Sequence, residues 1–418
     1  MSQIVKTYAL FLGSALLMFA GGLQGLLLSV RGAEEQFSLL ALGLIGTGWS
    51  VGFVAGSISV PMLVRRVGHI RAYAVMASVG AITILLNLIW VNDLGWIFLR
   101  IFSGFCFAGA AMIVESWLNE VSDNANRGTI FSLYVMVNMT ASTVGQLSMS
   151  ITGVQGYIPF VIGAMAFIMA ILPTALSTRQ QPRPLSSAKL DLGLLYRTSP
   201  IAVIASFSVG MANGTFGTLA PVYGYQLGFA PGEIAYLMAV PLIVGALAQV
   251  PFGRASDFID RRAVIIVASL LAASVGTALV LINPEQGWLL YLLFGLYGFS
   301  AFPIQAVAVA HANDFAKEGD FAAVAAGMLL ILGIGLAIGP ALAALSMGQI
   351  GPVGLFVVTA TFHGALAVTA LVRMRIRPIK DAEGRVRFRS MPMGRNTTPA
   401  TIALDPRADG TVSETTEE

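Results

Sequence analysis

Two charged side chains stand inside long apolar runs, where they could do chemistry. Arg100 lies a few residues into the run 95–118, and Glu115 lies near its end. A charge placed inside a membrane costs at least about 2.5 kcal/mol and normally faces a cavity or a partner. We therefore expect Arg100 to face a cavity and to favour neutral or anionic solutes over cations. The alternative is an interfacial arginine whose guanidinium reaches outward.

Glu115 is too far along the same run to neutralise Arg100. Fifteen residues of helix separate the two by roughly 22 Å. We expect Glu115 to pair instead with a base in a nearby loop: Arg65, Arg66, Arg71 or Arg127. A structural ion pair is the preferred interpretation, and proton transfer is the alternative. Either interaction is consistent with Glu115 forming part of a latch at a cytoplasmic gate.

Uncharged polar and aromatic residues form a second set of candidates. Amides supply hydrogen-bond donors and acceptors without the cost of a charge, although they also join helices to one another. Small-molecule sites usually add apolar walls. With Arg100, the expected substrate cavity comprises the amides Gln24, Asn138, Gln146, Asn213 and Gln305 and the rings of Trp49, Tyr236 and Tyr297.

Several other kinds of chemistry are disfavoured. The histidines, His69, His311 and His363, are scattered, and Cys106 is the only cysteine. We expect no enzyme, no metal site and no cofactor, because no catalytic cluster is visible. No Gly-rich phosphate loop precedes a helix, which argues against ATP-driven pumping. The net charge of +3 gives no indication of nucleic-acid binding.

The elements that must carry these residues are membrane-spanning helices. The chain is 56% hydrophobic and 11% charged, whereas soluble domains carry about 25% charged residues. Apolar runs of about 20 residues can cross a bilayer as helices, and lipid-exposed strands would leave backbone groups unpaired. Twelve such runs are predicted, at 8–30, 38–63, 71–91, 95–118, 129–152, 157–177, 199–221, 232–252, 263–282, 287–310, 322–347 and 352–374.

The polar segments divide the chain and orient it. A Pro- and Ser-containing linker at 178–198 separates a six-helix half, 1–177, from another, 199–375, and a polar tail at 376–418 is expected to be disordered. Of the 24 Lys and Arg residues, 22 (24 minus Arg31 and Arg100) fall on one side of the membrane. The positive-inside rule then predicts an inner-membrane protein with both termini in the cytoplasm.

The two halves also resemble each other. Trp96 and Trp288 open corresponding runs at an offset of 192, and FSGFCFAGA at 102–110 resembles FGLYGFSAF at 294–302. An even number of runs separates the halves, so they point the same way. Parallel repeats of this kind are typical of one transporter architecture, whose site lies at the interface between the halves.

The loop GRASDFIDRR at 253–262 resembles a signature of the major facilitator superfamily, Gly-x-x-x-Asp-Arg-x-Gly-Arg-Arg. It matches at Gly253, Asp257, Arg261 and Arg262 and departs at Phe258 and Asp260. The corresponding first loop, PMLVRRVGHI, keeps Arg66 and Gly68 and has Arg65 where the family has Asp. The motifs VES at 114–116, NRG at 126–128, VGQL at 144–147 and IGP at 338–340 are similar to those of the YcaD-like branch.

This resemblance implies an all-α, twelve-helix fold in two parallel six-helix halves and a function in transport. We expect a monomeric secondary transporter that moves a small organic solute by alternating access, coupled to protons, with efflux slightly favoured. An uptake permease or uniporter for a neutral or anionic metabolite is the alternative, and a receptor, channel or enzyme on the same scaffold is a distant one. The gating and coupling set is Arg65, Arg66, Gly68, Arg71, Glu115, Arg127, Gly253, Asp257, Arg261 and Arg262.

Overall fold

The computed structural model describes residues 3–121, 127–175, 192–316 and 321–376. The described residues contain helices and no strand. In chain order the helices are α1 (Gln3–Glu34), α2 (Leu39–Val67), α3 (His69–Ile89), α4 (Asp93–Val121), α5 (Arg127–Leu147), α6 (Met149–Thr152), α7 (Ile158–Met169), α8 (Ile171–Ala175), α9 (Leu192–Thr198), α10 (Pro200–Gln226), α11 (Pro231–Phe258), α12 (Arg261–Ile282), α13 (Trp288–Ala301), α14 (Ile304–Phe315), α15 (Phe321–Ile350) and α16 (Gly354–Ile376).

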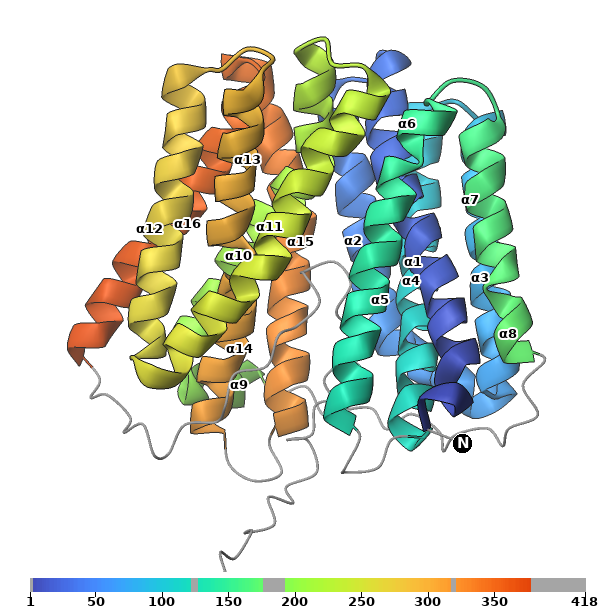
Figure 1. Ribbon diagram of the computed structural model, residues 1–418, viewed down its shortest axis with the longest axis horizontal. Coiled ribbons are helices and arrows are strands. Elements are labelled where there is room, and N and C mark those ends of the chain that lie inside the picture. Colours follow the sequence, from blue (N-terminus) through green and yellow to red (C-terminus); the bar gives the residue numbers. More distant parts are fainter. Residues whose placement is uncertain (1–2, 122–126, 176–191, 317–320, 377–418) are drawn as a thin grey trace, which may run out of the picture.

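Eleven of the twelve predicted spans have a helix in the described residues that is long and apolar enough to cross a membrane. The exception is the run 129–152, which forms α5 and α6. Residues such as Asn138, Thr140 and Gln146 make α5 more polar than the others. It nevertheless packs along α1 in the bundle (Figure 1) and also contacts α11 of the second half.

Two predicted spans are interrupted, and part of the predicted linker is helical. The span 287–310 breaks between α13 and α14, where Pro303 cannot donate a backbone hydrogen bond to the preceding turn. The span 157–177 is divided into α7 and α8 at Ala170. The predicted linker ends in the short helix α9, and the rest of it lies outside the described residues, as does the tail from residue 377.

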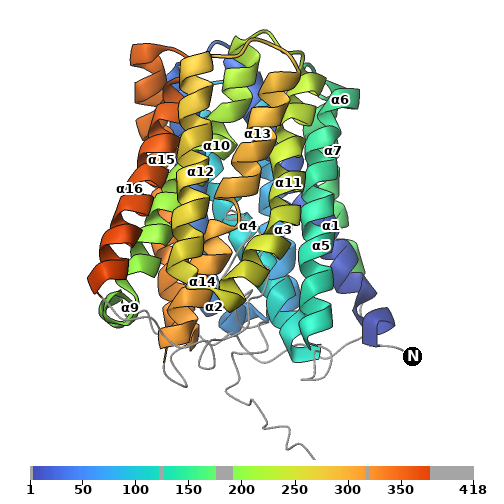
Figure 2. The same ribbon diagram turned by 60° about the vertical axis from the view of Figure 1, so that its left-hand side comes forward.

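Figures 1 and 2 show α1–α8 and α10–α16 as two bundles that lie side by side. In the first, α1 packs on α5 and α2 on α4; in the second, α10 packs on α15 and α11 on α13. These are the same pairs by position in each half, as the predicted repeat requires. Gly22 and Gly214, at an offset of 192 (214 minus 22), both let their helix approach a neighbouring backbone, at Ser142 and Leu336.

The two ends of the bundle differ in charge. The end that holds Arg65, Arg66, Arg254, Arg261, Arg262 and Arg373 is called the basic end. The other end holds Glu34, Glu35, Asp93, Glu233 and Glu285 and is called the acidic end. The helix α1 begins at the basic end, where the N-terminus is marked in Figure 1.

The halves touch each other through α2 and α15 towards the acidic end. Thr47 Oγ1 donates a hydrogen bond to the Ala337 carbonyl at 2.6 Å, and Ser50 Oγ donates to the Leu336 carbonyl at 3.2 Å. Gly43 lies directly against the Pro340 carbonyl, where an added Cβ would be 2.6 Å away. The acidic end is therefore held shut by backbone and hydroxyl contacts.

Candidate functional site

A cavity lies between the two halves. Its lining comes from α1, α2, α4 and α5 of the first half and from α10, α11 and Phe302, the residue that follows α13, in the second. Its volume is about 160 Å³. One water molecule needs about 10–15 Å³ on this measure, so the space holds roughly 11 to 16 waters and suits a small organic solute.

Arg100 supplies the charge of this cavity. Its side chain is only 4% exposed, and its guanidinium carbon lies 5.8 Å from the centroid of the Trp49 ring, within the range of a cation–π interaction. Arg100 Nη1 donates to Ser103 Oγ at 3.4 Å, and Ser103 Oγ in turn donates to Gln24 Oε1 at 3.4 Å. Gln24 therefore lies behind Arg100 and helps to fix its position, rather than lining the cavity.

Two of the predicted amides line the cavity, one from each half. Gln146 projects from α5 and Asn213 from α10. Their carbonyl oxygens, Oε1 and Oδ1, are buried and have no donor among the described residues. A buried polar atom without a partner costs about 1–3 kcal/mol.

Aromatic rings form much of the remaining wall. Trp49 stacks on Phe53 with the ring centroids 5.1 Å apart and leans on Phe107 at 5.7 Å. Across the cavity, Phe216 and Phe302 contribute from the second half. Some lining residues were not predicted from the sequence: Phe107, Phe216, Phe302 and the glycines of α1. An apolar residue inside an apolar run gives no signal that it faces a cavity.

Four other predicted cavity residues lie elsewhere. Tyr236 is 54% exposed on the outer side of α11, and Tyr297 is buried behind Phe216, on which it stacks at 4.6 Å. Asn138 accepts a hydrogen bond from Ser14 Oγ at 2.7 Å, and Gln305 bonds with Ser206 at 3.1 Å. Both amides therefore make a hydrogen bond between helices, which was the alternative to a contact with the solute. Trp49, Arg100, Gln146 and Asn213 are the predicted residues that the structure brings together at the cavity.

Glu115 is fully buried inside the first half and accepts a hydrogen bond from Tyr134 Oη at 2.7 Å. Tyr134 also interacts with Asn138 and Ser14, so the carboxyl group is joined to a polar path between α4, α5 and α1. The side chains of Arg65, Arg66 and Arg71 are exposed at the basic end, and the side chain of Arg127 lies outside the described residues. Tyr134 was not predicted from sequence as a partner of Glu115.

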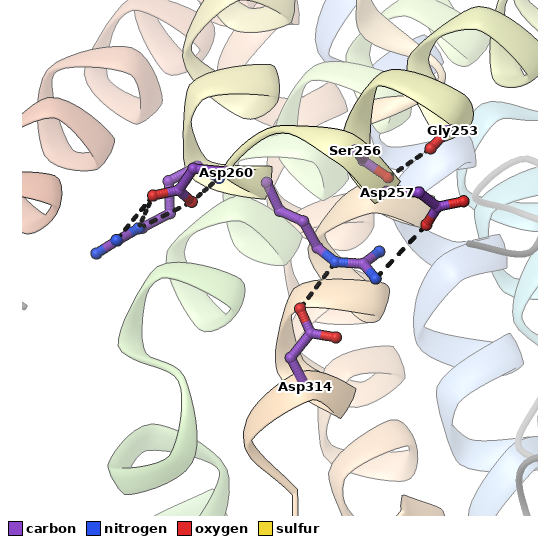
Figure 3. Close-up of polar contacts among 7 residues, drawn as sticks. Gly253, Ser256, Asp257, Asp260 and Asp314 are labelled. Atoms are coloured by element: carbon purple, nitrogen blue, oxygen red, sulfur yellow. Dashed lines mark hydrogen bonds and ion pairs between the residues drawn. The ribbon is translucent and has the colours of Figure 1, made fainter. Parts of the chain in front are cut away.

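The corner where α11 ends and α12 begins carries a set of ion pairs within the second half (Figure 3). Arg261 is 1% exposed and lies between Asp257, at 3.8 Å, and Asp314 of α14, with Nε 2.8 Å from Oδ2. Gly253 contributes its carbonyl oxygen, which accepts from Ser256 Oγ at 2.8 Å. This set ties the α11–α12 corner to α14. In the first loop, Gly68 has φ 85°, a conformation that favours glycine, and it joins α2 to α3.

Asp260 is the N-cap of α12. Its Oδ1 accepts from the Arg262 backbone N–H at 2.9 Å, and its carboxylate pairs with the Arg262 guanidinium at 2.8 Å. Burial acts to raise the pKa of Asp260, but the hydrogen bonds and charge of Arg262, with a contribution from His311, outweigh it. The pKa therefore lies below its ordinary value of 3.8.

We expect Asp260→Ala to lower the unfolding temperature by an amount equivalent to about 1 kcal/mol, because it removes both the cap and the ion pair. Asp260→Asn keeps an acceptor for the cap and should lose less. A depressed folded-state pKa means that the charge stabilises the protein above pH 3.8 and that this contribution disappears as the pH falls through the folded-state pKa. Thermal unfolding in detergent at pH 7, 5 and 3.5 tests this: the difference between wild type and Asp260→Asn should shrink only at the lowest pH.

Comparisons with known proteins agree with this architecture. The model of the Major Facilitator Superfamily matches residues 10–230 and 202–397. The "Uncharacterized MFS-type transporter YcaD" of Salmonella newport (strain SL254) is 27% identical over 365 residues, which cover 86% of this chain and 94% of that protein. The Salmonella typhi protein of the same description is 26% identical over 355 residues, covering 84% of this chain and 91% of its own length.

Solved structures share the fold at low sequence identity. A mutant of the nucleoside transporter NupG superimposes with a TM-score of 0.77 at 15% identity, covering 88% of this chain and 99% of that one. A bacterial homolog of the human lysosomal transporter Spinster, in an inward-facing and occupied conformation, gives 0.73 at 16% identity, covering 92% and 99%. The chain is a multi-pass membrane protein and a transporter of the major facilitator superfamily.

Proposed function

We propose that the protein moves a small organic solute across the inner membrane by alternating access. The observation that carries the proposal is the cavity between the halves, in which Arg100 and Gln146 face Asn213 across the interface. A site shared by two parallel repeats is reached from alternate sides when one half rocks against the other. We also propose that it acts as a monomer, because one chain forms the whole cavity.

We propose that the basic end faces the cytoplasm and that the structure represents an inward-facing state. The distribution of Lys and Arg supports the orientation through the positive-inside rule, and both termini then lie in the cytoplasm. The inter-half hydrogen bonds from Thr47 and Ser50 at the acidic end support the conformational assignment. The Spinster homolog of similar fold was solved in an inward-facing conformation.

We further propose coupling to protons, with export slightly favoured over uptake. Glu115 supports the coupling, because a carboxyl group buried inside a membrane span, here accepting a hydrogen bond from Tyr134, is the kind of group that proton relays use. Uptake or uniport of a neutral or anionic metabolite is the second candidate, and the Arg100 side chain in the cavity favours it.

Flux measurements in proteoliposomes test the function. We expect accumulation of a solute that saturates with concentration and that collapses when an ionophore dissipates the proton gradient. Saturable flux that survives the ionophore would favour the uniporter. Conductance that does not saturate would contradict alternating access. Empty liposomes are the control, and Glu115→Gln is a test variant in which flux should no longer depend on the proton gradient.

Asp257→Asn should slow turnover while leaving solute affinity nearly unchanged. The carboxylate of Asp257 holds Arg261 at the α11–α12 corner, at the basic end, which must close and reopen in each cycle. We expect turnover to fall about fivefold, equivalent to roughly 1 kcal/mol on the barrier. The matched control is Glu285→Gln, an exposed acid at the other end. Equal turnover in wild type and Asp257→Asn would contradict a role of this loop in gating.

A further inference from the structure

We infer that the solute is a compact organic monocarboxylate with an apolar body of about ten non-hydrogen atoms. The inference rests on the proposed function, since it names what occupies the transport cavity. Three independent properties of the lining lead to it: its charge, the direction of its amides, and the nature of its walls.

The charge of the cavity selects an anion with a single negative charge. Arg100 is the charged residue of the lining, and neither Asp nor Glu contributes to it. In a protein interior a cationic solute beside this guanidinium would be repelled and would also lose its hydration. A second negative charge on an anion would have no matching cation in the lining. The planar fork of arginine donates two parallel hydrogen bonds to a carboxylate, which matches one such group.

The amides of the lining present donors to the same space. The oxygens of Gln146 and Asn213 are buried in the wall without donors among the described residues, whereas both residues line the cavity. The amide NH₂ group is therefore the part of each side chain that can meet a solute. Two such donors and a guanidinium suit a solute whose polar atoms are acceptors. Because Asn213 comes from the second half, the bound anion joins the two halves.

The walls require an apolar body behind the carboxylate. Trp49 and Phe107 lie on one side and Phe216 and Phe302 on the other. The cavity has room for roughly 11 to 16 waters, which accommodates a phenyl or short alkyl group with its carboxylate. Trp49 belongs both to the apolar wall and to the surroundings of the charge, because its ring lies 5.8 Å from the Arg100 guanidinium.

Ligands that share a carbon skeleton and differ in their polar head group (carboxylate, amide or ammonium) test the inference. The probes are phenylacetate, phenylacetamide and phenethylamine, and hexanoate, hexanamide and hexylamine. Binding to the purified full-length protein is measured by isothermal titration, and flux of each probe is measured in proteoliposomes. We expect one or both carboxylates to bind at least about tenfold more tightly than the amide and amine of the same skeleton. Preference for an amine or amide, or binding of none of the six, would overturn the inference.

Two substitutions locate the preference in the cavity. Arg100→Gln should reduce the ratio of carboxylate to amide affinity to about one, while Arg375→Gln, a change at an exposed arginine on α16, leaves the ratio unchanged. Asn213→Asp is isosteric and places a negative charge beside the bound carboxylate, so carboxylate affinity should fall about tenfold or more and amide affinity should not. An unchanged ratio in both variants, with normal elution on size exclusion, would overturn the inference.

The two proposals fail in different ways. Tight, Arg100-dependent binding of a carboxylate that never crosses the liposome membrane would leave the solute class standing and contradict transport. Saturable flux of amides or amines that is insensitive to Arg100→Gln would support transport and contradict the solute class.

Discussion

Gly52→Ala is expected to destabilise the protein and to distort the cavity, although it adds only one methyl group. The helix α2 crosses α4 so closely that a Cβ on Gly52 would overlap the Ile101 carbonyl oxygen and lie 2.7 Å from its carbon. A backbone carbonyl cannot swing aside, so the helices must separate. Overpacking of this kind costs about 1–3 kcal/mol, which exceeds the gain of up to about 1 kcal/mol from the better helix propensity of alanine.

The matched control is Gly364→Ala in α16, where an added Cβ meets no heavy atom within 4 Å. This variant should unfold at the same temperature as wild type or at a higher one. Because α2 carries Trp49 and α4 carries Arg100, Gly52→Ala should also weaken solute binding, and Gly364→Ala should not. Thermal unfolding in detergent and isothermal titration provide the two readouts. Equal unfolding temperatures for the two variants would show that α2 and α4 do not depend on this contact.

The membrane-spanning helices could be predicted because the signal for them is local. A run of about 20 apolar residues has few other stable structures in lipid. The weakest span, α5, shows the limit of that signal. Its amides lower its hydropathy below that of its neighbours, yet Asn138 bonds with Ser14 inside the bundle and Gln146 lines the cavity. Polar residues on a buried face do not prevent a helix from spanning the membrane.

The lining of the cavity could be predicted only in part, because position along a helix is not position around it. In an amphipathic helix the polar residues reveal which face is buried, but these helices are apolar on every side. Gln146 and Asn213 were placed at the correct depth and also face the cavity. Tyr236 was placed at a similar depth and is exposed on the far side of α11. Nothing in the residues around Tyr236 distinguishes these two outcomes.

The partner of Glu115 shows the same limit for charged residues. Spacing along the chain placed Glu115 near the loop bases at the basic end, and that depth is consistent with the structure. The contact that the structure describes is with Tyr134, which α5 presents from a different part of the sequence. Tyrosine in an apolar run is usually part of the packing, so sequence alone gave no reason to choose it.

Ser50→Ala is expected to shift the protein towards a state that is open at the acidic end. Pro340 has no N–H, so the Leu336 carbonyl lacks its donor within α15. Ser50 Oγ of α2 supplies one from the other half at 3.2 Å, and it shares its single proton with the Gly46 carbonyl of its own helix at 3.1 Å. Removing it leaves a buried acceptor unpaired, at a cost of about 1–3 kcal/mol in the closed arrangement, whereas water can reach the carbonyl once that end opens. The ratio of open to closed molecules should rise about fivefold or more.

Spin labels at Leu40 and Gln349, which are exposed on α2 and α15 at the acidic end, measure this ratio as a distance distribution. Cys106, the only cysteine of the chain, is buried, so the labels can be attached at these two positions. Thr47→Val, which keeps the shape of the side chain and removes its bond to Ala337, should act in the same direction. A control variant, Thr361→Val, removes a hydroxyl bond within α16 and should leave the distances unchanged.

Pro340→Ala separates this mechanism from a general loss of packing. Alanine restores the backbone N–H that can donate to the Leu336 carbonyl, so the carbonyl no longer depends on Ser50. In the Pro340→Ala background, Ser50→Ala should therefore change the open-to-closed ratio less than about twofold, and the difference between the backgrounds measures the coupling. An equal shift in both backgrounds would mean that Ser50 contributes by packing alone. If the effect of Ser50→Ala depends on Pro340, the IGP motif has a physical role. Its proline leaves the Leu336 carbonyl without a donor in α15, and that carbonyl then bonds to Ser50 of the other half.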